Sequence, residues 1–232
     1  MPDVTLHQFE ISPFCQKVQR ILRLKGIPFE VREVSALRSA VDVRRINRIG
    51  KLPVLELDGE LIADSSEIAR VLDERFPDPP LWPQDPRERA QCHVLEDWAD
   101  ESLYFYEMTM RLQWSSNSAH WGRELLRGDG PLAQAIAPVL VPRLVAQRTK
   151  AQGVGRKPRE LVLRELERHL EALDTFLDDG DWLASSTLTI ADIAVAAQVT
   201  AIAGAHEGRA ALDGHPPTRA WLARVDAATV AT

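Results

Sequence analysis

The sequence predicts two domains, an α/β domain followed by an all-helical one. Segments with the patterns of short strands and of helices alternate over residues 1–76. Residues 77–86 follow with five prolines, and such a segment can neither continue a helix nor enter the middle of a sheet. Strand patterns do not return after it. We therefore expect domains at 1–76 and 87–232, joined by a proline-rich linker.

The first half of the α/β domain has the pattern of a strand, a helix and a second strand. Val4 to Phe9 alternates as a short strand does. Ser12 is a favourable N-cap, Pro13 suits the first position of a helix, and Gly26 provides a stop. The next strand is expected at Phe29 to Val34. Because the connections are short, this unit is expected to be parallel and right-handed.

The second half adds a short helix, a hairpin and a closing helix. An irregular helix is expected within residues 41–46. Residues 52–57 alternate again, and Asp58-Gly59 is a strong signal for a two-residue hairpin leading into residues 60–63. A helix that extends to Phe76 closes the domain. The order β-α-β-α-β-β-α is the thioredoxin-like arrangement.

Residues 87–232 carry helical patterns throughout. Helices are expected at 87 to about 114, 160–177, 189–203 and 216–228. The second of these has one apolar face, and the third is apolar nearly all round, which is typical of a helix buried in the middle of a bundle. Glycines and prolines break the chain between the first two. Residues 114–158 are longer than a minimal connection, so we expect a helix pair there with a mobile rim over a binding pocket.

Composition excludes several classes of protein. The net charge of -6 gives no support to nucleic-acid binding, which favours a basic balance. No apolar run approaches the length of a membrane span. The two cysteines, Cys15 and Cys92, form neither a disulfide framework nor a zinc pattern, and the six histidines show no spacing typical of metal ligands. A reducing cytoplasm and a site without metal are the expectation.

Three motifs, in this order and at these spacings, resemble the glutathione transferase family. Ser12-Pro13-Phe14-Cys15 resembles the active-site motif of serine-type classes such as the plant tau class. The segment from Lys51 to Leu55 is similar to the family's segment before the third strand, whose proline is cis. Asp64-Ser65 is similar to its acidic-Ser pair at the start of a helix. The resemblance continues through Thr189 to Asp192, where Thr189 and Asp192 also fit a capping box.

The resemblance implies a thioredoxin-like domain that binds glutathione, with Ser12 as the catalytic residue. Glutathione reacts as a thiolate, yet a free thiol has a pKa of about 8.5. A hydroxyl that donates to the sulfur at the positive end of a helix favours the anion. Alternatively, Ser12 only caps its own helix. The expected glutathione contacts are Phe14, Lys51, Leu52, Pro53, Asp64 and Ser65.

Each expected contact has a chemical reason and a simpler alternative. A cis Pro53 would leave the backbone of Leu52 free to pair with the cysteinyl part of glutathione by strand addition, whereas a trans proline would simply begin a strand. Lys51 meets the glycine carboxylate or is a solvated surface lysine. Ser65 and the first free N–H groups hold the γ-glutamyl carboxylate and Asp64 pairs with its ammonium group, or one of the two is only an N-cap. Phe14 is expected mainly to pack.

The second substrate is expected to be a small apolar electrophile bound against the helical domain. Aromatic residues cluster near the end of the first long helix, and we select Tyr106 and Trp114 as its pocket. The family also implies a homodimer. Two rival functions stay open: a glutathione-dependent reductase or isomerase that uses Cys15, and a non-catalytic binding protein with the same fold.

Overall fold

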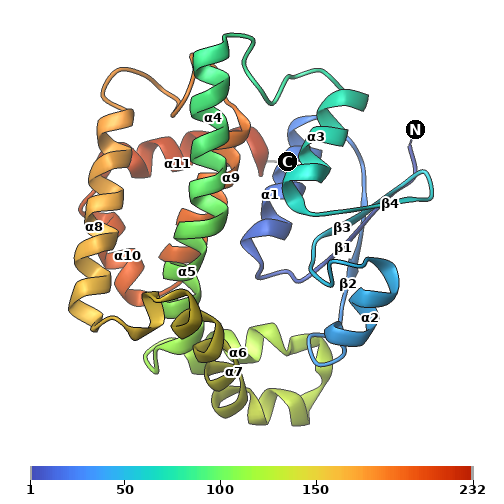
Figure 1. Cartoon of the computed structure of the whole chain (residues 1–232), viewed down its shortest axis with the longest axis vertical. Coiled ribbons are helices and arrows are strands. Elements are labelled where there is room, and N and C mark those ends of the chain that lie inside the picture. The colour runs from blue at the N-terminus through green and yellow to red at the C-terminus, as the bar shows by residue number, and fades with distance from the viewer. Residues whose placement is uncertain (1, 231–232) are drawn as a thin grey trace.

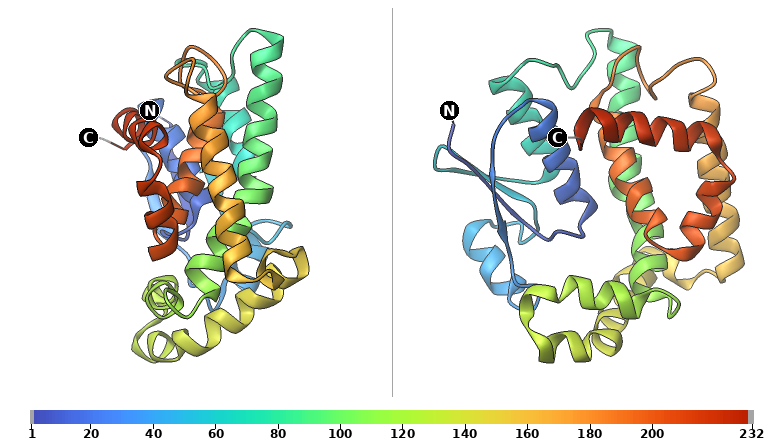
Figure 2. Two further views of the ribbon diagram at one scale, coloured as in Figure 1. Left: turned by 90° about the vertical axis from the view of Figure 1, so that its left-hand side faces the viewer. Right: turned by 180° about the vertical axis from the view of Figure 1, so that it is seen from behind.

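The first domain is built on a four-stranded sheet. The computed structural model describes residues 2–230, without the side chain of Ala40. The strands are β1 (Val4–Gln8), β2 (Glu30–Glu33), β3 (Val54–Leu57) and β4 (Glu60–Ala63). Their order is β2-β1-β3-β4; β1 is parallel to β2, and the other two pairs are antiparallel. The right-hand view of Figure 2 shows this sheet, in blue to teal, beside the later helices, which are green to red. The parallel strand–helix–strand unit and the hairpin predicted from the sequence are both confirmed.

Three helices accompany the sheet. They are α1 (Pro13–Leu24), α2 (Ser39–Ile46) and α3 (Ser65–Arg75). As expected, Ser12 takes the N-cap position of α1 with extended backbone, and Pro13 is the first helical residue. The helix ends before Gly26, whose φ of +62° lies in the left-handed region that glycine adopts without strain. Together with the sheet, α1 and α3 give the thioredoxin-like arrangement that the element order predicts.

The second domain is all-helical. Residues 76–85 form an irregular connection with several bends after α3. The helices are α4 (Pro86–Trp98), α5 (Tyr104–Glu107), α6 (Ser118–Leu125), α7 (Pro131–Gln152), α8 (Arg159–Phe176), α9 (Ile190–Ala203), α10 (His206–Asp213) and α11 (Pro216–Thr229). Two π-helical segments, η1 (Ala99–Leu103) and η2 (Met108–Gln113), continue α4 and α5 as one helical run. Two 3-10 turns, η3 (Arg127–Asp129) and η4 (Val154–Arg156), flank α7. The long first helix is thus confirmed, although it is not uniformly α-helical, and α10 is an additional helix that was not predicted from the sequence.

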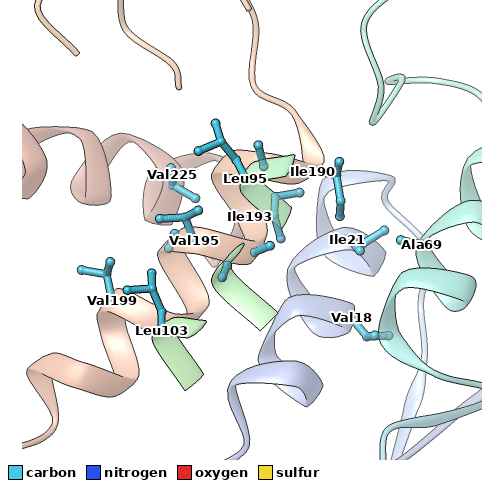
Figure 3. Packing of buried hydrophobic residues seen from close by; sticks show 14 of the residues in the cluster. Val18, Ile21, Ala69, Leu95, Leu103, Ile190, Ile193, Val195, Val199 and Val225 are labelled. Atoms are coloured by element: carbon cyan, nitrogen blue, oxygen red, sulfur yellow. The ribbon is translucent and has the colours of Figure 1, made fainter. Parts of the chain in front are cut away.

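One hydrophobic core runs through both domains. Figure 3 shows Val18 and Ile21 of α1 beside Ala69 of α3. On its other side α1 meets α9, which contributes the fully buried Ile190 and Ile193. As predicted, α9 lies in the middle of the bundle, and the capping box of Thr189 is present at its start. Among the described residues, no helix combines the length and the apolar character needed to cross a bilayer.

The predicted helix pair within residues 114–158 is formed by α6 and α7, which project together at the bottom of Figure 1. Asp129, at the turn between them, accepts hydrogen bonds from the backbone N–H groups of Ala36 (3.0 Å) and Leu37 (3.4 Å) and from the hydroxyl of Ser35. These three residues connect β2 to α2. The tip of the helix pair is therefore tied to the first domain, and its mobility stays a prediction.

We expect Asp129→Asn to loosen this tie. A neutral amide oxygen accepts hydrogen bonds less strongly than a carboxylate, and a loss of about 1.4 kcal/mol would raise amide exchange about tenfold. Hydrogen–deuterium exchange of residues 35–38 and 126–131 measures the change. Glu124→Gln, which breaks only the ion pair with Arg127 in the same turn, is the matched control. Equal exchange in Asp129→Asn and wild type would show that Asp129 does not hold the rim.

Candidate active site

A cavity of about 700 Å³ lies between the two domains. Three separate segments of the first domain contribute to it: the start of α1, the segment before β3 and the start of α3. All seven residues predicted from this domain line the cavity: Ser12, Phe14, Lys51, Leu52, Pro53, Asp64 and Ser65. The fold therefore brings together residues as far apart in the sequence as Ser12 and Ser65.

The hydroxyl of Ser12 makes no capping bond to its own helix. The backbone of Ser12 is fixed, since its N–H donates to the carbonyl of Phe9 (3.0 Å) and its C=O accepts from the N–H of Gln16 (3.0 Å). An N-cap role thus accounts for the backbone of Ser12 but not for its side chain, whose neighbour within α1 is the Cys15 thiol. Ser12 lines the cavity at the end of α1 where the helix dipole is positive.

The segment before β3 offers free backbone groups to the cavity. The Leu52–Pro53 peptide bond is cis, as the resemblance implies. Within residues 2–230, neither the N–H nor the C=O of Leu52 has a hydrogen-bonding partner. The neighbouring turn is held by the side chain of Asn47, which accepts from the N–H of Gly50 (2.7 Å) and donates to the carbonyl of Lys51 (3.0 Å). The Lys51 side chain is exposed at the cavity rim.

Asp64 proves to be the N-cap of α3. Its Oδ1 accepts from the N–H groups of Ser66 (3.0 Å) and Glu67 (3.3 Å). Two of the N–H groups that we expected to hold a ligand carboxylate are therefore already taken. The groups left for a ligand are the N–H and hydroxyl of Ser65 and the second carboxylate oxygen of Asp64.

Cys15 is fully buried in α1. Burial raises the pKa of its thiol to about 12, although hydrogen bonding to the Ser12 side chain and to the backbone of Phe9 opposes this effect. A thiol with such a pKa is protonated at neutral pH, and thiols react as thiolates. The structure therefore disfavours the interpretation of Cys15 as a redox nucleophile.

The opposite wall of the cavity is one face of the run α4-η1-α5 and the first residue of η2. Its lining residues recur every three or four positions, which places them on the same side of the helix: His93, Glu96, Asp97, Asp100, Glu101, Tyr104, Phe105 and Met108. Arg148 of α7 completes this wall. The ring of Tyr104 meets the ring of Phe14 edge-on, with 4.8 Å between centroids, so Phe14 packs across the domain interface as expected.

Tyr106 and Trp114 do not line this cavity, which corrects the choice made from the sequence. Tyr106 lies two positions after Tyr104, about 200° around an α-helix, and its hydroxyl donates to Glu165 (2.8 Å) on the far side. Trp114 follows the π-helical segment η2 and packs under the guanidinium of Arg159. A search for residues in phase with His93 would have found Tyr104 instead.

A buried lysine lies under the acidic side of the cavity. Nζ of Lys17 contacts Glu96 (2.8 Å), Asp100 (2.7 Å) and the hydroxyl of Ser66 (3.2 Å). Burial disfavours the charged amine, but Asp100 and Glu96 outweigh it and raise the pKa of Lys17 above its ordinary value. Lys17 therefore links α1 to the helical domain as a cation.

A second, more apolar cavity of about 310 Å³ adjoins the first. The two share Phe9, Ser39 and Arg148 in their linings. Leucines and valines at the end of α6 and in α7 form most of its remaining wall: Leu125, Leu126, Leu140, Val141, Leu144 and Val145. A cavity thus lies beside the predicted helix pair, lined by aliphatic residues and by neither of the two chosen aromatics, and its role as the second-substrate pocket stays a prediction.

Glu107 is a buried carboxyl behind the cavity wall. Burial raises its pKa to about 7, and the ion pair with Arg111 (3.2 Å) only partly opposes this shift. In the unfolded chain its pKa would be about 4.3. Between these two values the folded protein holds the proton and the unfolded chain does not. Glu107 therefore lowers stability progressively as the pH rises through this window.

We expect Glu107→Gln to flatten the pH dependence of stability. The amide cannot ionise, so the variant should lose less free energy of unfolding than wild type between pH 5 and pH 8, by on the order of 2–3 kcal/mol. Urea unfolding at four pH values in this range measures the difference. Parallel pH profiles would show that Glu107 is already ionised at pH 5.

The fold and the cavity define a class of protein: a thioredoxin-like domain and a helical domain that enclose a binding site between them. Within the described residues, no three His, Cys, Asp or Glu side chains gather as metal ligands would. The model of the glutathione S-transferase N-terminal domain matches residues 6–80, and that of the glutathione S-transferase C-terminal domain matches residues 143–224. The chain belongs to the glutathione S-transferase family.

Individual relatives agree with this assignment. Glutathione S-transferase U4 of Arabidopsis thaliana is 32% identical over 102 residues, which are 44% of this chain and 46% of that protein. The chain spans about half the length of the curated relatives it matches. A glutathione S-transferase of Rhodospirillum rubrum F11 has a TM-score of 0.71 at 23% identity, covering 96% of this chain and 87% of that one. One of Methylobacterium radiotolerans, solved with glutathione sulfonate, has a TM-score of 0.65 at 26% identity, covering 97% and 91%.

Proposed function

We propose that this protein is a glutathione transferase in which the thiolate of bound glutathione attacks a small apolar electrophile. The observation that carries the proposal is the convergence of seven residues from three sequence segments on one cavity. The cavity, at about 700 Å³, has the size of a small-molecule site. The match to a relative solved with glutathione sulfonate supports the same ligand class.

Glutathione would lie across the first-domain wall. Its cysteinyl backbone would pair with the free N–H and C=O of Leu52, as an added strand does. Lys51 would meet the glycine carboxylate. At the other end, Ser65 would donate to the γ-glutamyl carboxylate and the free oxygen of Asp64 would accept from the ammonium group. The sulfur would then lie near Ser12, whose hydroxyl donates to the thiolate.

The electrophile would bind on the side of the helical domain. Tyr104, Phe105 and Met108 offer an apolar surface next to the proposed position of the sulfur. The adjoining aliphatic cavity has room for an extended apolar group. Catalysis would then consist mainly of thiolate stabilisation and of holding the two reactants together.

Binding and turnover assays test the proposal. The protein should be retained on glutathione-agarose and should conjugate glutathione to chlorodinitrobenzene. Cys15→Ser should leave both properties nearly unchanged, because the native thiol is buried and protonated. Retention without turnover would favour another glutathione-dependent reaction, and loss of activity in Cys15→Ser would favour the reductase. A protein that is not retained at all would favour the non-catalytic binding role. Two buried free cysteines are consistent with a cytoplasmic location.

We further propose that the protein is a homodimer in which the first domain of one copy meets the helical domain of the other. Each domain exposes an apolar side chain on its surface, Leu61 on β4 and Val94 on α4. Sedimentation at micromolar concentration should give twice the 26.0 kDa mass of one chain. The double variant Leu61→Glu, Val94→Glu should shift the equilibrium towards monomer. A wild-type monomer would contradict this expectation.

A further inference from the structure

The turn that carries Ser12 is held from the helical domain as well as from its own helix. Within the first domain, the Ser12 N–H donates to Phe9 and closes the turn of residues 9–12. The side chain of Ile11, inside this turn, packs against a second hydrophobic cluster that η2, α6 and α7 supply. The backbone carbonyl of Ile11 also points to the helical domain, where it meets Arg111.

Arg111 binds this carbonyl with two nitrogens. Nη1 and Nη2 donate to the carbonyl oxygen of Ile11 at 3.3 Å and 3.2 Å. The carbonyl belongs to the peptide group that joins Ile11 to Ser12. Because this group is planar, fixing the direction of the carbonyl also fixes the orientation of the N–H and Cα of Ser12. Arg111 itself is 2% exposed, and water therefore does not compete for these bonds.

The guanidinium is held rigidly by its other neighbours. Glu107, one helical turn earlier, accepts from Nη1 at 3.2 Å. The ring of Trp121 lies 3.9 Å from the guanidinium carbon, measured to the ring centroid. Trp121 is in turn fixed by the bond from its indole N–H to the carbonyl of Gly204 (2.9 Å). A Cβ at Gly204 would come within 2.8 Å of the tryptophan ring, so only glycine fits there.

We propose that Arg111 is a positioning residue for the reaction: it sets the direction of the Ser12 hydroxyl through the carbonyl of Ile11. The inference rests on the proposed role of Ser12. The hydroxyl makes no capping bond to α1 and has the buried Cys15 thiol as its neighbour, so its direction towards the cavity depends on the backbone from which it extends as well as on this contact. Because Arg111 belongs to η2, its hydrogen bonds to Ile11 also fix the position of Ser12 relative to the wall that binds the electrophile.

Spectroscopy of the bound thiol tests this role, with Arg111→Met as the main variant. Small misplacements of a catalytic group cost up to about a hundredfold in rate. We expect kcat with chlorodinitrobenzene to fall about tenfold to a hundredfold, while the KM and Kd for glutathione change by less than about threefold. The pKa of the bound glutathione thiol, followed by the ultraviolet absorbance of the thiolate, should rise towards its value in solution.

Arg111→Lys provides a second, milder variant. It keeps a cation opposite Glu107 and one donor for Ile11, but it loses the second donor and the planar contact with Trp121. We expect a thiol pKa and a kcat between those of wild type and Arg111→Met. If Arg111→Met does not fold, the proposal is judged on the lysine variant against wild type.

Arg20→Met is the matched control. Arg20 is also a buried arginine that ties α1 to the helical domain, through Thr229 (2.8 Å) and Asp226 (2.7 Å), but it does so far from the Ser12 turn. This variant should lower the melting temperature and leave the thiol pKa unchanged. A thiol pKa equal in wild type and the folded Arg111 variants would overturn the positioning role. If wild type itself does not lower the thiol pKa, the proposed role of Ser12 fails first, and this inference with it.

Discussion

Replacing Ser12 with alanine should lower turnover by roughly 10- to 1000-fold and leave glutathione binding nearly intact. Losing one well-placed donor to a developing or bound anion has a cost of this size. Binding should survive, because Leu52, Asp64 and Ser65 would carry most of the ligand contacts. The direct measurement is the pH titration of the bound thiol, whose pKa should be higher in Ser12→Ala than in wild type.

Two further variants sharpen this expectation. Ser12→Cys should introduce thiol–disulfide exchange, since a cysteine at a helix N-terminus has a lowered pKa. Cys15→Ser should titrate as wild type does. A bound thiol that titrates identically in wild type and Ser12→Ala would show that Ser12 is not the thiolate stabiliser. The reductase interpretation requires the reverse order, with Cys15→Ser inactive and Ser12→Ala only mildly affected.

Replacing Lys17 with methionine should destabilise the fold by about 3–5 kcal/mol, the cost of removing one partner of a buried ion pair. The reason is the environment of its partners. Glu96 is 2% exposed and Asp100 is largely buried, so both carboxylates would be left without their cation in a medium of low polarity. Urea unfolding of the unliganded protein at pH 7 measures the loss.

The charges of the partners decide how this loss is interpreted. In a background of Glu96→Gln and Asp100→Asn, the change Lys17→Met should cost much less, because no buried charge is left uncompensated. A double-mutant cycle therefore separates the ionic contribution from the packing of the lysine stem. An equal cost in both backgrounds would assign the effect to packing alone.

The sequence predicted the elements of the first domain because its signals are local. Ser12-Pro13 begins α1, and Asp58-Gly59 turns the hairpin, each for a reason that lies within a few residues. The residues proposed to bind glutathione came from the resemblance of three motifs to the family, and each motif lies at or just before the start of such an element. Their convergence on one cavity follows from the thioredoxin-like topology itself.

The helical wall could not be predicted with the same means. Its face depends on position around one long helix, and no cap or turn signal marks which side of that helix meets the cavity. Tyr106 was chosen for its residue type, whereas position around the helix decides which aromatic meets the cavity. The tie between Arg111 and Ile11 was also invisible, because it joins residues a hundred positions apart.

Because the two domains share one hydrophobic core, we expect them to unfold together. Residues of α1 pack against α3 on one side and α9 on the other, so the helix that begins at Ser12 is covered completely only while both domains are folded. Separating the domains would uncover fully buried side chains of α1 and α9. The two domains therefore differ in family and in topology, but we expect them to unfold together as one cooperative unit. A partly open state with only one wall of the cavity formed is correspondingly costly, and the cavity persists or is lost as a whole.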